Sequence, residues 1–393
     1  GVYTLGGVNP DFTSFTELST VLNNAGQTGP VTVNVRDGDY YEQFVLSSIA
    51  GNSFVNTLTI KGESGDSSLV RLWYDDMTTR FVFDIRNVNG LTLRDMTFQS
   101  SGSFGGNNVF NFYDCDTLKV QNCFFKGKSY SDVNPAGSYY HIKVYFEGVR
   151  GGEIRNNNFG YVNSVNSLAS ELRILDNSRM GSSGGTLKVL SSTTMSSKVL
   201  FSGNTVYFHN NVDGQAFDIQ TAKHNLNANL PGDTFIISNN RYENLNSSST
   251  GYRHIQATSG DYIIFKFNTI INQNVSWYFL NVDSILGNRF TGASNTSLIH
   301  VEGESFIANN YFEVGGTVDN RAIYLNTGTN TVVVANNSIN NTGTSSGSYG
   351  LYGPGSLENV TVKNNIFSAS GGGTPVYLGS SVSNIDWDYN CYY

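Results

Sequence analysis

A six-residue pattern recurs along this chain and constrains its fold more than any other feature. It reads apolar, any residue, Asn/Asp/Gly, Asn, any residue, apolar or aromatic, and Ile237–Tyr242 and Ile307–Phe312 are clear copies. The last positions of the copies are residues 98, 125, 159, 206, 242, 270, 290, 312, 339, 367 and 392. A period of about 20–28 residues, with longer intervals between 125 and 242, is typical of a solenoid.

The fourth position of the pattern forms a column of asparagines, which only Met96 and Cys123 break. Its members are Asn157, Asn204, Asn240, Asn268, Asn288, Asn310, Asn337, Asn365 and Asn390. Asparagine tolerates the positive φ of a tight turn better than other non-glycine residues. Stacked asparagine side chains also hydrogen-bond between coils and satisfy each other's buried amides. We therefore expect these residues to form a structural asparagine ladder at one turn of every coil.

Alternating segments precede the copies, as in Phe81–Ile85 and Ile142–Phe146. Alternation with period two indicates strands with one buried face and one solvated face. Each period then holds two or three short strands, and the apolar or aromatic sixth position stacks inside the coil. The pattern predicts an all-β protein, a right-handed parallel β-helix of roughly a dozen coils.

The first thirty residues predict a cap for this solenoid. Ser14–Glu17 has the form of a capping box, and Phe15, Leu18, Val21 and Leu22 share one helical face that ends before Gly26. We expect a single domain over residues 1–393, with a cap at 1–30, coils at 31–393 and long loop insertions within 126–235. The chain begins with Gly1 and stops directly after a repeat, so we expect it to be part of a longer polypeptide.

Composition narrows the functional classes. Of the 393 residues, 14% are charged, where about 25% is usual. The net charge of −8 and the lack of a Lys/Arg cluster disfavour nucleic acid as a partner. No apolar run reaches the roughly 18 residues that membrane insertion requires. Three cysteines cannot form a disulfide scaffold in a chain of this length, and a bond between Cys115 and Cys123 is disfavoured.

The opening of the chain resembles a known group of proteins. Tyr3–Gly7, Asp11–Phe15, Gly29–Arg36 and Gly38–Gln43 resemble the start of right-handed β-helix regions in large secreted surface proteins of Bacteroidetes-type bacteria. The later Asn-Asn-x-Phe coils resemble the repeat shared by pectate lyases, pectin methylesterases and phage tailspikes, which have the pectate-lyase-like superfamily fold. The resemblance implies export, display on a bacterial cell surface and contact with a polysaccharide or cell-surface glycan.

Titratable and aromatic residues are densest between 126 and 224. Alternation along the segment from 139 to 147 places every second side chain, from Tyr139 to Glu147, on the outer face of a strand. The next coil adds Arg173. Aromatic faces beside polar groups suit a sugar, although an ordinary solvated strand face has the same pattern. The candidate carbohydrate-binding residues are Tyr139, His141, Lys143, Tyr145, Glu147 and Arg173.

Motifs for catalysis are missing, so we assign no catalytic residue. Asp75 and Asp76 form the only adjacent acidic pair and are typical of a turn, whereas glycoside hydrolysis requires two carboxylates flanking the bond. The five histidines lack metal-ligand spacing and are typical of surface or turn positions, and the cysteines are too few for a zinc site. We expect no metal and no cofactor. Calcium remains an option that no motif indicates, because Gly-Gly-x-Gly-x-Asp repeats are absent.

The preferred hypothesis is a non-catalytic secreted or cell-surface module that serves as a stalk or adhesin and contacts polysaccharide. One alternative is a polysaccharide lyase or glycoside hydrolase with its site in the 126–224 insertions. Another alternative is a fibre similar to a phage tailspike, which requires an exposed apolar stripe on one face. Tyr278 and Tyr324 lie in segments that the sequence predicts to be strands, and they leave that alternative open.

Overall fold

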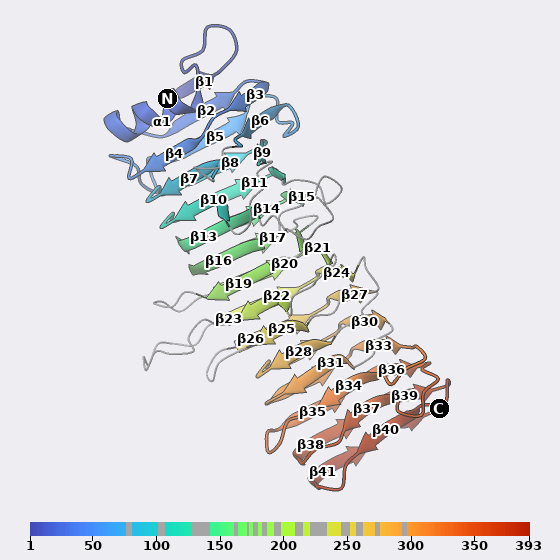
Figure 1. Ribbon diagram of the computed structural model, residues 1–393. Coiled ribbons are helices and arrows are strands. Elements are labelled where there is room, and N and C mark those ends of the chain that lie inside the picture. Colours follow the sequence, from blue (N-terminus) through green and yellow to red (C-terminus); the bar gives the residue numbers. More distant parts are fainter. Residues whose placement is uncertain are drawn as a thin grey trace. The chain divides into compact units, whose positions relative to one another are not determined.

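The computed structural model describes residues 1–75, 81–100, 107–126, 142–160, 164–170, 173–175, 180–182, 187–191, 198–208, 215–220, 234–244, 252–256, 262–271, 276–292 and 297–393. The chain divides into two compact units, Gly1–Leu200 and Phe201–Tyr393. In each unit, short strands pair in parallel with the equivalent strand of the next coil (Figure 1). Much of the predicted insertion region 126–235 lies outside the described residues, and its loops, like the single domain, stay a prediction.

The first unit contains one helix, α1 (Phe15–Ala25), and three described parallel sheets. One sheet is β1 (Val2–Leu5), β2 (Val31–Val35), β5 (Leu58–Gly62), β8 (Leu91–Arg94), β11 (Lys119–Gln121), β14 (Glu153–Arg155) and β17 (Arg173–Leu175). The second is β4 (Phe44–Ser47), β7 (Phe83–Arg86), β10 (Asn107–Tyr113), β13 (Ile142–Arg150), β16 (Ser164–Ser170) and β19 (Leu187–Ser191). The third is β3 (Gly38–Tyr41), β6 (Val70–Trp73), β9 (Thr97–Gln99), β12 (Phe124–Lys126) and β15 (Asn158–Gly160). Two further strands precede or span the boundary between the two units. They are β18 (Met180–Ser182), in the first unit, and β20 (Lys198–Ser202), which contains the boundary.

The second unit also has three described parallel sheets. One is β23 (Thr234–Ser238), β26 (Tyr262–Lys266), β29 (Ser284–Leu286), β32 (Ser305–Ala308), β35 (Val332–Ala335), β38 (Leu357–Lys363) and β41 (Val382–Asp388). Another is β21 (Thr205–Phe208), β24 (Arg241–Asn244), β27 (Thr269–Ile271), β30 (Arg289–Gly292), β33 (Tyr311–Val314), β36 (Ser338–Asn341), β39 (Ile366–Ala369) and β42 (Cys391–Tyr392). The third is β22 (Gln215–Gln220), β25 (Tyr252–Gln256), β28 (Trp277–Leu280), β31 (Ser297–Glu302), β34 (Arg321–Leu325), β37 (Tyr349–Gly353) and β40 (Thr374–Leu378).

Side-chain alternation explains why these segments form coils. Strands such as β5 and β35 alternate buried with half-buried residues, so each strand turns one face to the core and one face outward. Three such strands with turns between them close one coil, and the parallel pairing stacks the coils. The prediction of an all-β parallel β-helix with a helix at its N-terminal end is confirmed.

Buried asparagines of the second unit are joined by hydrogen bonds from one coil to the next. The Oδ1 atom of Asn288 accepts from the backbone N–H of Asn268 (2.8 Å) and from its Nδ2 (3.0 Å). The Nδ2 of Asn288 also donates to the carbonyl of Phe265 (3.0 Å). The same series runs through Asn204, Asn240, Asn268, Asn288, Asn310, Asn337, Asn365 and Asn390. These bonds satisfy polar groups that burial removes from water.

The expectation that the column asparagines themselves adopt positive φ is wrong. The left-handed residue is the one before each of them, as in Asn239 (φ 55°), Asn309 (φ 57°) and Asn364 (φ 57°). One left-handed residue makes the turn, and the following asparagine then carries its side chain into the coil, where it is buried. The third position of the pattern is therefore Asn, Asp or Gly because these residues tolerate a left-handed backbone. The fourth position is Asn because its side chain forms the hydrogen bonds between coils.

The sixth position of the pattern packs in the core. The rings of Phe290 and Phe312 are stacked with centroids 5.1 Å apart, and those of Phe125 and Phe159 with centroids 5.0 Å apart. All four side chains are buried, as the sequence predicts. Tyr392, in the last copy, differs because it is 46% exposed.

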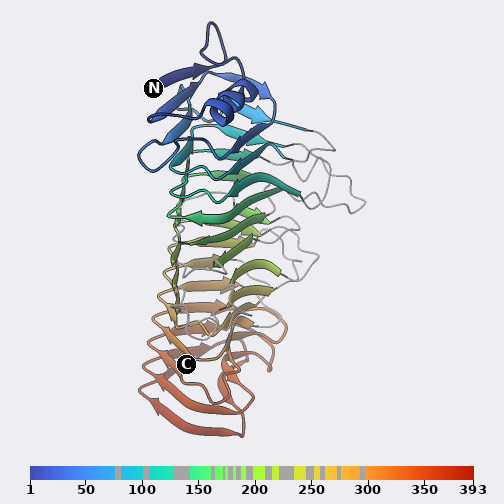
Figure 2. The same cartoon turned by 90° about the vertical axis from the view of Figure 1, so that its left-hand side faces the viewer.

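Helix α1 lies beside the first coils (Figure 2). The ring of Phe15 packs edge-on against Tyr40 and Phe44, each with centroids 5.3 Å apart. Ser14 caps the helix as predicted, since its side chain accepts from the N–H of Glu17 (3.0 Å). The predicted apolar face is wrong at Val21, which is 41% exposed; Ser19 is buried instead.

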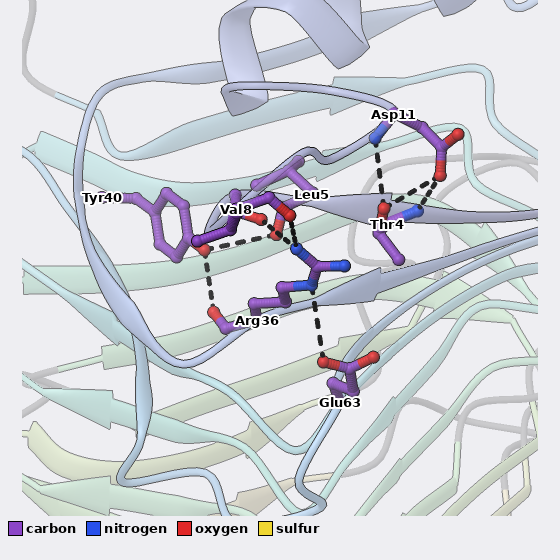
Figure 3. Close-up of polar contacts among 8 residues, drawn as sticks. Thr4, Leu5, Val8, Asp11, Arg36, Tyr40 and Glu63 are labelled. Carbon is purple, nitrogen blue, oxygen red and sulfur yellow. Dashed lines mark hydrogen bonds and ion pairs between the residues drawn. The ribbon is translucent and has the colours of Figure 1, made fainter.

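The loop between β1 and α1 is fixed to the first coil by polar contacts (Figure 3). Arg36 donates to the carbonyl of Val8 and lies 3.8 Å from a carboxylate oxygen of Glu63. The carboxylate of Asp11 accepts from the backbone N–H (2.7 Å) and the hydroxyl (2.9 Å) of Thr4, and these hydrogen bonds lower the pKa of Asp11. The contacts hold the loop in place, so we assign this cluster a structural role.

Two of the three cysteines are buried free thiols. Cys123 occupies the asparagine column; its N–H donates to Asn157 Oδ1 (2.9 Å), and its thiol lies 3.7 Å from the carbonyl of Leu93. That thiol contact resembles the contact that an asparagine amide makes with the coil before it. Cys115 is also buried and unpaired, which agrees with the disfavoured disulfide. Burial raises the pKa of each of these two thiols to about 12.

Candidate functional site

The sequence-predicted carbohydrate-binding residues are divided between two sheets. Tyr139 and His141 lie outside the described residues. The backbone of β13 carries Lys143, Tyr145 and Glu147, and it pairs with β10 and β16. Arg173 lies on β17, which pairs with β14 in a different sheet. The side chains of these four residues are outside the described part, so this patch stays a prediction.

The described residues contain a second candidate, an aromatic stripe on the outer face of the second unit. Parallel register places one aromatic residue of each strand beside the next, from β28 through β31, β34 and β37 to β40. The first four of these residues directly follow a buried residue of their strand, and the fifth follows the half-buried Val376, so alternation turns them outward. The members are Tyr278, His300, Tyr324, Tyr352 and Tyr377, with Tyr349 beside them on β37.

Neighbouring rings of the stripe are in contact. The His300 ring lies between Tyr278 and Tyr324, with centroids 4.3 and 4.2 Å away. Tyr352 lies 5.4 Å from Tyr324 and 5.3 Å from Tyr377 between ring centroids. Contacts of this kind stabilise a pair by about 0.5–1.5 kcal/mol. They hold the rings as a continuous surface, because each side chain restricts its neighbours.

The stripe is partly open to solvent. Its members are half-buried except Tyr377, which is 42% exposed. The hydroxyl groups of Tyr324, Tyr349 and Tyr352 make no hydrogen bond to any described residue, and none of these oxygens is sealed from solvent. The surface thus combines apolar ring faces with hydroxyl groups that are free to donate and accept.

Charged groups flank the stripe on opposite sides. At the start of β34, the guanidinium carbon of Arg321 lies 4.3 Å from the ring centroid of Tyr352 and 6.0 Å from that of Tyr324. At the end of β31, the Glu302 carboxylate lies 3.2 Å from His300 Nε2 and accepts from Asn326 Nδ2 (3.1 Å). The strands are parallel, so the cation lies at their N-terminal side and the carboxylate at their C-terminal side.

His300 is a strand residue rather than the surface or turn residue that the sequence suggested. Its side chain is 14% exposed. Burial lowers the pKa of His300 below its ordinary value, while the Glu302 carboxylate acts in the opposite direction with a smaller effect. The imidazole is therefore neutral at neutral pH and contributes an uncharged ring to the stripe.

No group of three or more His, Cys, Asp or Glu side chains within the described ranges is arranged to hold a metal ion. Of the Asp75–Asp76 pair, Asp75 is exposed and Asp76 lies outside the described residues. Among the described residues there is no helix with the length and apolar character of a membrane span.

Sequence comparison finds no relative for this chain. No family model matches it, and no curated protein matches it.

Comparison of structures finds similar folds. Bacteriophage CBA120 tailspike protein 3 is similar with a TM-score of 0.50 and 13% identity, and the match covers 98% of this chain and 61% of the tailspike chain. A mutant of the periplasmic alginate epimerase AlgG has a TM-score of 0.48 at 9% identity, covering 100% of this chain and 84% of that chain. The A-module of the Azotobacter vinelandii mannuronan C-5 epimerase AlgE6 has a TM-score of 0.46 at 14% identity, covering 96% and 95%. This chain thus spans less than two thirds of the tailspike, and the likeness shows a shared parallel β-helix fold.

Proposed function

We propose that this chain is a non-catalytic module of a secreted or cell-surface protein and that it contacts polysaccharide through the aromatic stripe. The observation that carries the proposal is the row of touching rings from Tyr278 to Tyr377 on an outer sheet face. A polysaccharide is a linear repeat, and the stripe is a linear repeat with one ring per strand, about 4.8 Å apart. Pyranose C–H faces pack on tyrosine rings, while sugar hydroxyls pair with the phenolic hydroxyls.

The groups of the stripe support binding rather than bond cleavage. Glycoside hydrolysis uses two carboxylates on either side of the scissile bond. Glu302 is the carboxylate at the described stripe; it accepts a hydrogen bond from Asn326 and lies 3.2 Å from His300 Nε2. The alternative of a lyase or hydrolase therefore rests on the 126–224 region. Tyr139, His141, Lys143, Tyr145, Glu147 and Arg173 remain proposed as a further glycan contact.

A tailspike-like fibre is the second candidate, and the stripe itself favours it, since a trimer needs an exposed apolar row. The stripe is narrow, however, with one or two rings per strand, whereas a stable interface buries about 800 Å² on each partner. Free phenolic hydroxyls also suit a sugar better than a dry interface. We therefore place glycan contact first, and light scattering of the purified protein separates the two: a trimer through the stripe would hide it from glycan.

Binding to a panel of polysaccharides tests the proposal. Tyr352→Ala should weaken binding about tenfold or more, the usual scale for an aromatic anchor. Tyr262→Ala is the matched control, because Tyr262 is 47% exposed on β26 in another sheet of the same unit. Thermal melting verifies that both variants fold. Equal binding by the wild type and Tyr352→Ala would contradict the site.

A further inference from the structure

Arg321 differs from the other arginines whose side chains the structure describes. Each of the others lies within 2.6–4.0 Å of a carboxylate oxygen of the protein. They are Arg36, Arg71, Arg86, Arg94, Arg150, Arg155, Arg241 and Arg289. No carboxylate among the described residues pairs with Arg321, and its buried Nε has no hydrogen-bond partner. A guanidinium has five N–H donors, and leaving a buried one unused is costly.

Two carboxylates, one close to Arg321 in sequence and one at the same stripe, have other hydrogen-bond partners. Asp319, two residues earlier, accepts from the hydroxyl of Ser345. Glu302, on the opposite flank of the stripe, accepts a hydrogen bond from Asn326 Nδ2 and lies 3.2 Å from His300 Nε2. The cation is instead placed against ring faces, 4.3 Å from the Tyr352 centroid. The donors of Arg321 are therefore unfilled at the edge of the surface to which we assign the glycan.

We infer that the aromatic stripe takes an anionic polysaccharide, a uronate-bearing one, whose carboxylate pairs with Arg321. This inference rests on the proposed function and adds the class of glycan. The carboxylate of a uronate is attached directly to the pyranose ring, so a sugar ring that lies against the stripe at Tyr352 brings it near the guanidinium. Carboxylate and guanidinium then form charge-assisted hydrogen bonds, about twice as strong as neutral ones.

The charge arrangement also sets an orientation. Arg321 attracts carboxylates at the N-terminal side of the strands, whereas Glu302 repels them at the C-terminal side. The uronate residue beside Tyr352 therefore turns its carboxylate toward the start of β34 and away from the end of β31.

Titration calorimetry with two matched ligands tests the inference. Oligomers of polygalacturonate and the same oligomers after reduction of their carboxyl groups share length and linkage and differ in charge. The wild type should bind the acidic oligomers about tenfold more tightly, and that preference should fall as salt is added. Arg321→Gln should lose the preference and keep affinity for the reduced oligomers within about twofold.

Arg289→Gln is the matched control. Arg289 also lies over a tyrosine, 5.4 Å from the Tyr311 centroid, but it is paired with Glu313 at 4.0 Å on another sheet. Its replacement should leave the preference unchanged. Arg321→Lys keeps the positive charge but lacks the planar guanidinium, so it should retain part of the preference for acidic oligomers. A partial preference in this variant would show that the loss in Arg321→Gln is not a folding defect.

Four outcomes would overturn the inference in distinguishable ways. Equal binding of acidic and reduced oligomers by the wild type overturns it and leaves the proposed function standing. An unchanged preference in Arg321→Gln overturns the role of Arg321. Tighter binding of a sulfated galactan than of the uronate overturns the choice of carboxylate. Absence of binding to every one of these ligands overturns the proposed function together with the inference.

Discussion

The Oδ1 atom of Asn288 accepts two hydrogen bonds from Asn268, one from the backbone N–H at 2.8 Å and one from Nδ2 at 3.0 Å. One side chain thus replaces water for two buried donors of the preceding coil. Its own Nδ2 satisfies a third group, the Phe265 carbonyl. The stability of the second unit therefore depends on this column.

Asn288→Ala should lower the free energy of unfolding by about 4 kcal/mol. The substitution leaves the Asn268 N–H and the Phe265 carbonyl buried without this partner. Each unpaired group lowers the free energy of unfolding by about 1–3 kcal/mol, and the lost side chain leaves a small cavity. Asn390→Ala, at the half-buried end of the column, should cost about 1 kcal/mol because water reaches the freed groups. Urea unfolding measures both, and similar losses at the two positions would contradict this role for the column.

Phe267→Asn should stabilise the protein by about 1 kcal/mol. Phe267 has φ 55°, a conformation that costs a bulky residue about 1–2 kcal/mol and that asparagine tolerates. Its side chain is 58% exposed, so little burial is lost. The reverse change, Asn239→Phe, should destabilise by a similar amount. A lower melting temperature for Phe267→Asn would show that the contacts of the ring outweigh its backbone strain.

Thiol labelling should distinguish the three cysteines. Burial holds the pKa of Cys115 and of Cys123 at about 12, so neither supplies thiolate near neutral pH, whereas Cys391 is exposed. The native protein should react with one equivalent of an aromatic disulfide reagent, and the protein unfolded in guanidinium with three. Rapid native reaction of two or three thiols would contradict the buried placement.

His300 should make the protein less stable in acid. Its pKa is lowered on folding, so the unfolded chain binds a proton at a higher pH than the folded chain does. Stability is then unaffected above the unfolded pKa of about 6.5 and falls as pH drops below it, by at most about 1.4 kcal/mol per pH unit.

The difference between wild type and His300→Phe isolates that contribution, since the variant keeps a ring between Tyr278 and Tyr324 and other acid-sensitive groups cancel. Urea unfolding from pH 7.5 to 5 measures it. The two proteins should lose stability at different rates, and parallel pH profiles would show that His300 titrates alike in both states.

The fold can be predicted from the sequence because each position of the repeat has one structural role. Asn310 was found from its column, and Phe312 from its place two residues later. The backbone role of the third position was assigned wrongly, because adjacent asparagines such as Asn309 and Asn310 look alike in sequence while one supplies a turn and the other a side chain. The exposure of Val21 depended on how α1 meets the first coils, which helical periodicity does not specify.

The aromatic stripe was only partly foreseen. The sequence indicates outward tyrosines at Tyr278 and Tyr324, but the column becomes apparent only when Tyr352 and Tyr377 are aligned by strand register. The signal in the sequence is one outward aromatic residue directly after an inward apolar residue in each strand from β28 to β40. Charge density favours the 126–224 region instead. The open donors of Arg321 could not be found from sequence, because every arginine looks alike until its carboxylate partners are placed.

Glycan binding measured together with product formation tests the central claim most directly. The protein is titrated with pectin, alginate, chondroitin and xylan while unsaturated ends and reducing sugar are monitored, alongside Tyr352→Ala and the pair Tyr139→Ala and Tyr145→Ala. The account predicts binding without product, and binding weaker by about tenfold or more in Tyr352→Ala. Turnover that disappears in Lys143→Ala or Arg173→Ala, with binding intact in Tyr352→Ala, would contradict it and place the activity in the 126–224 region.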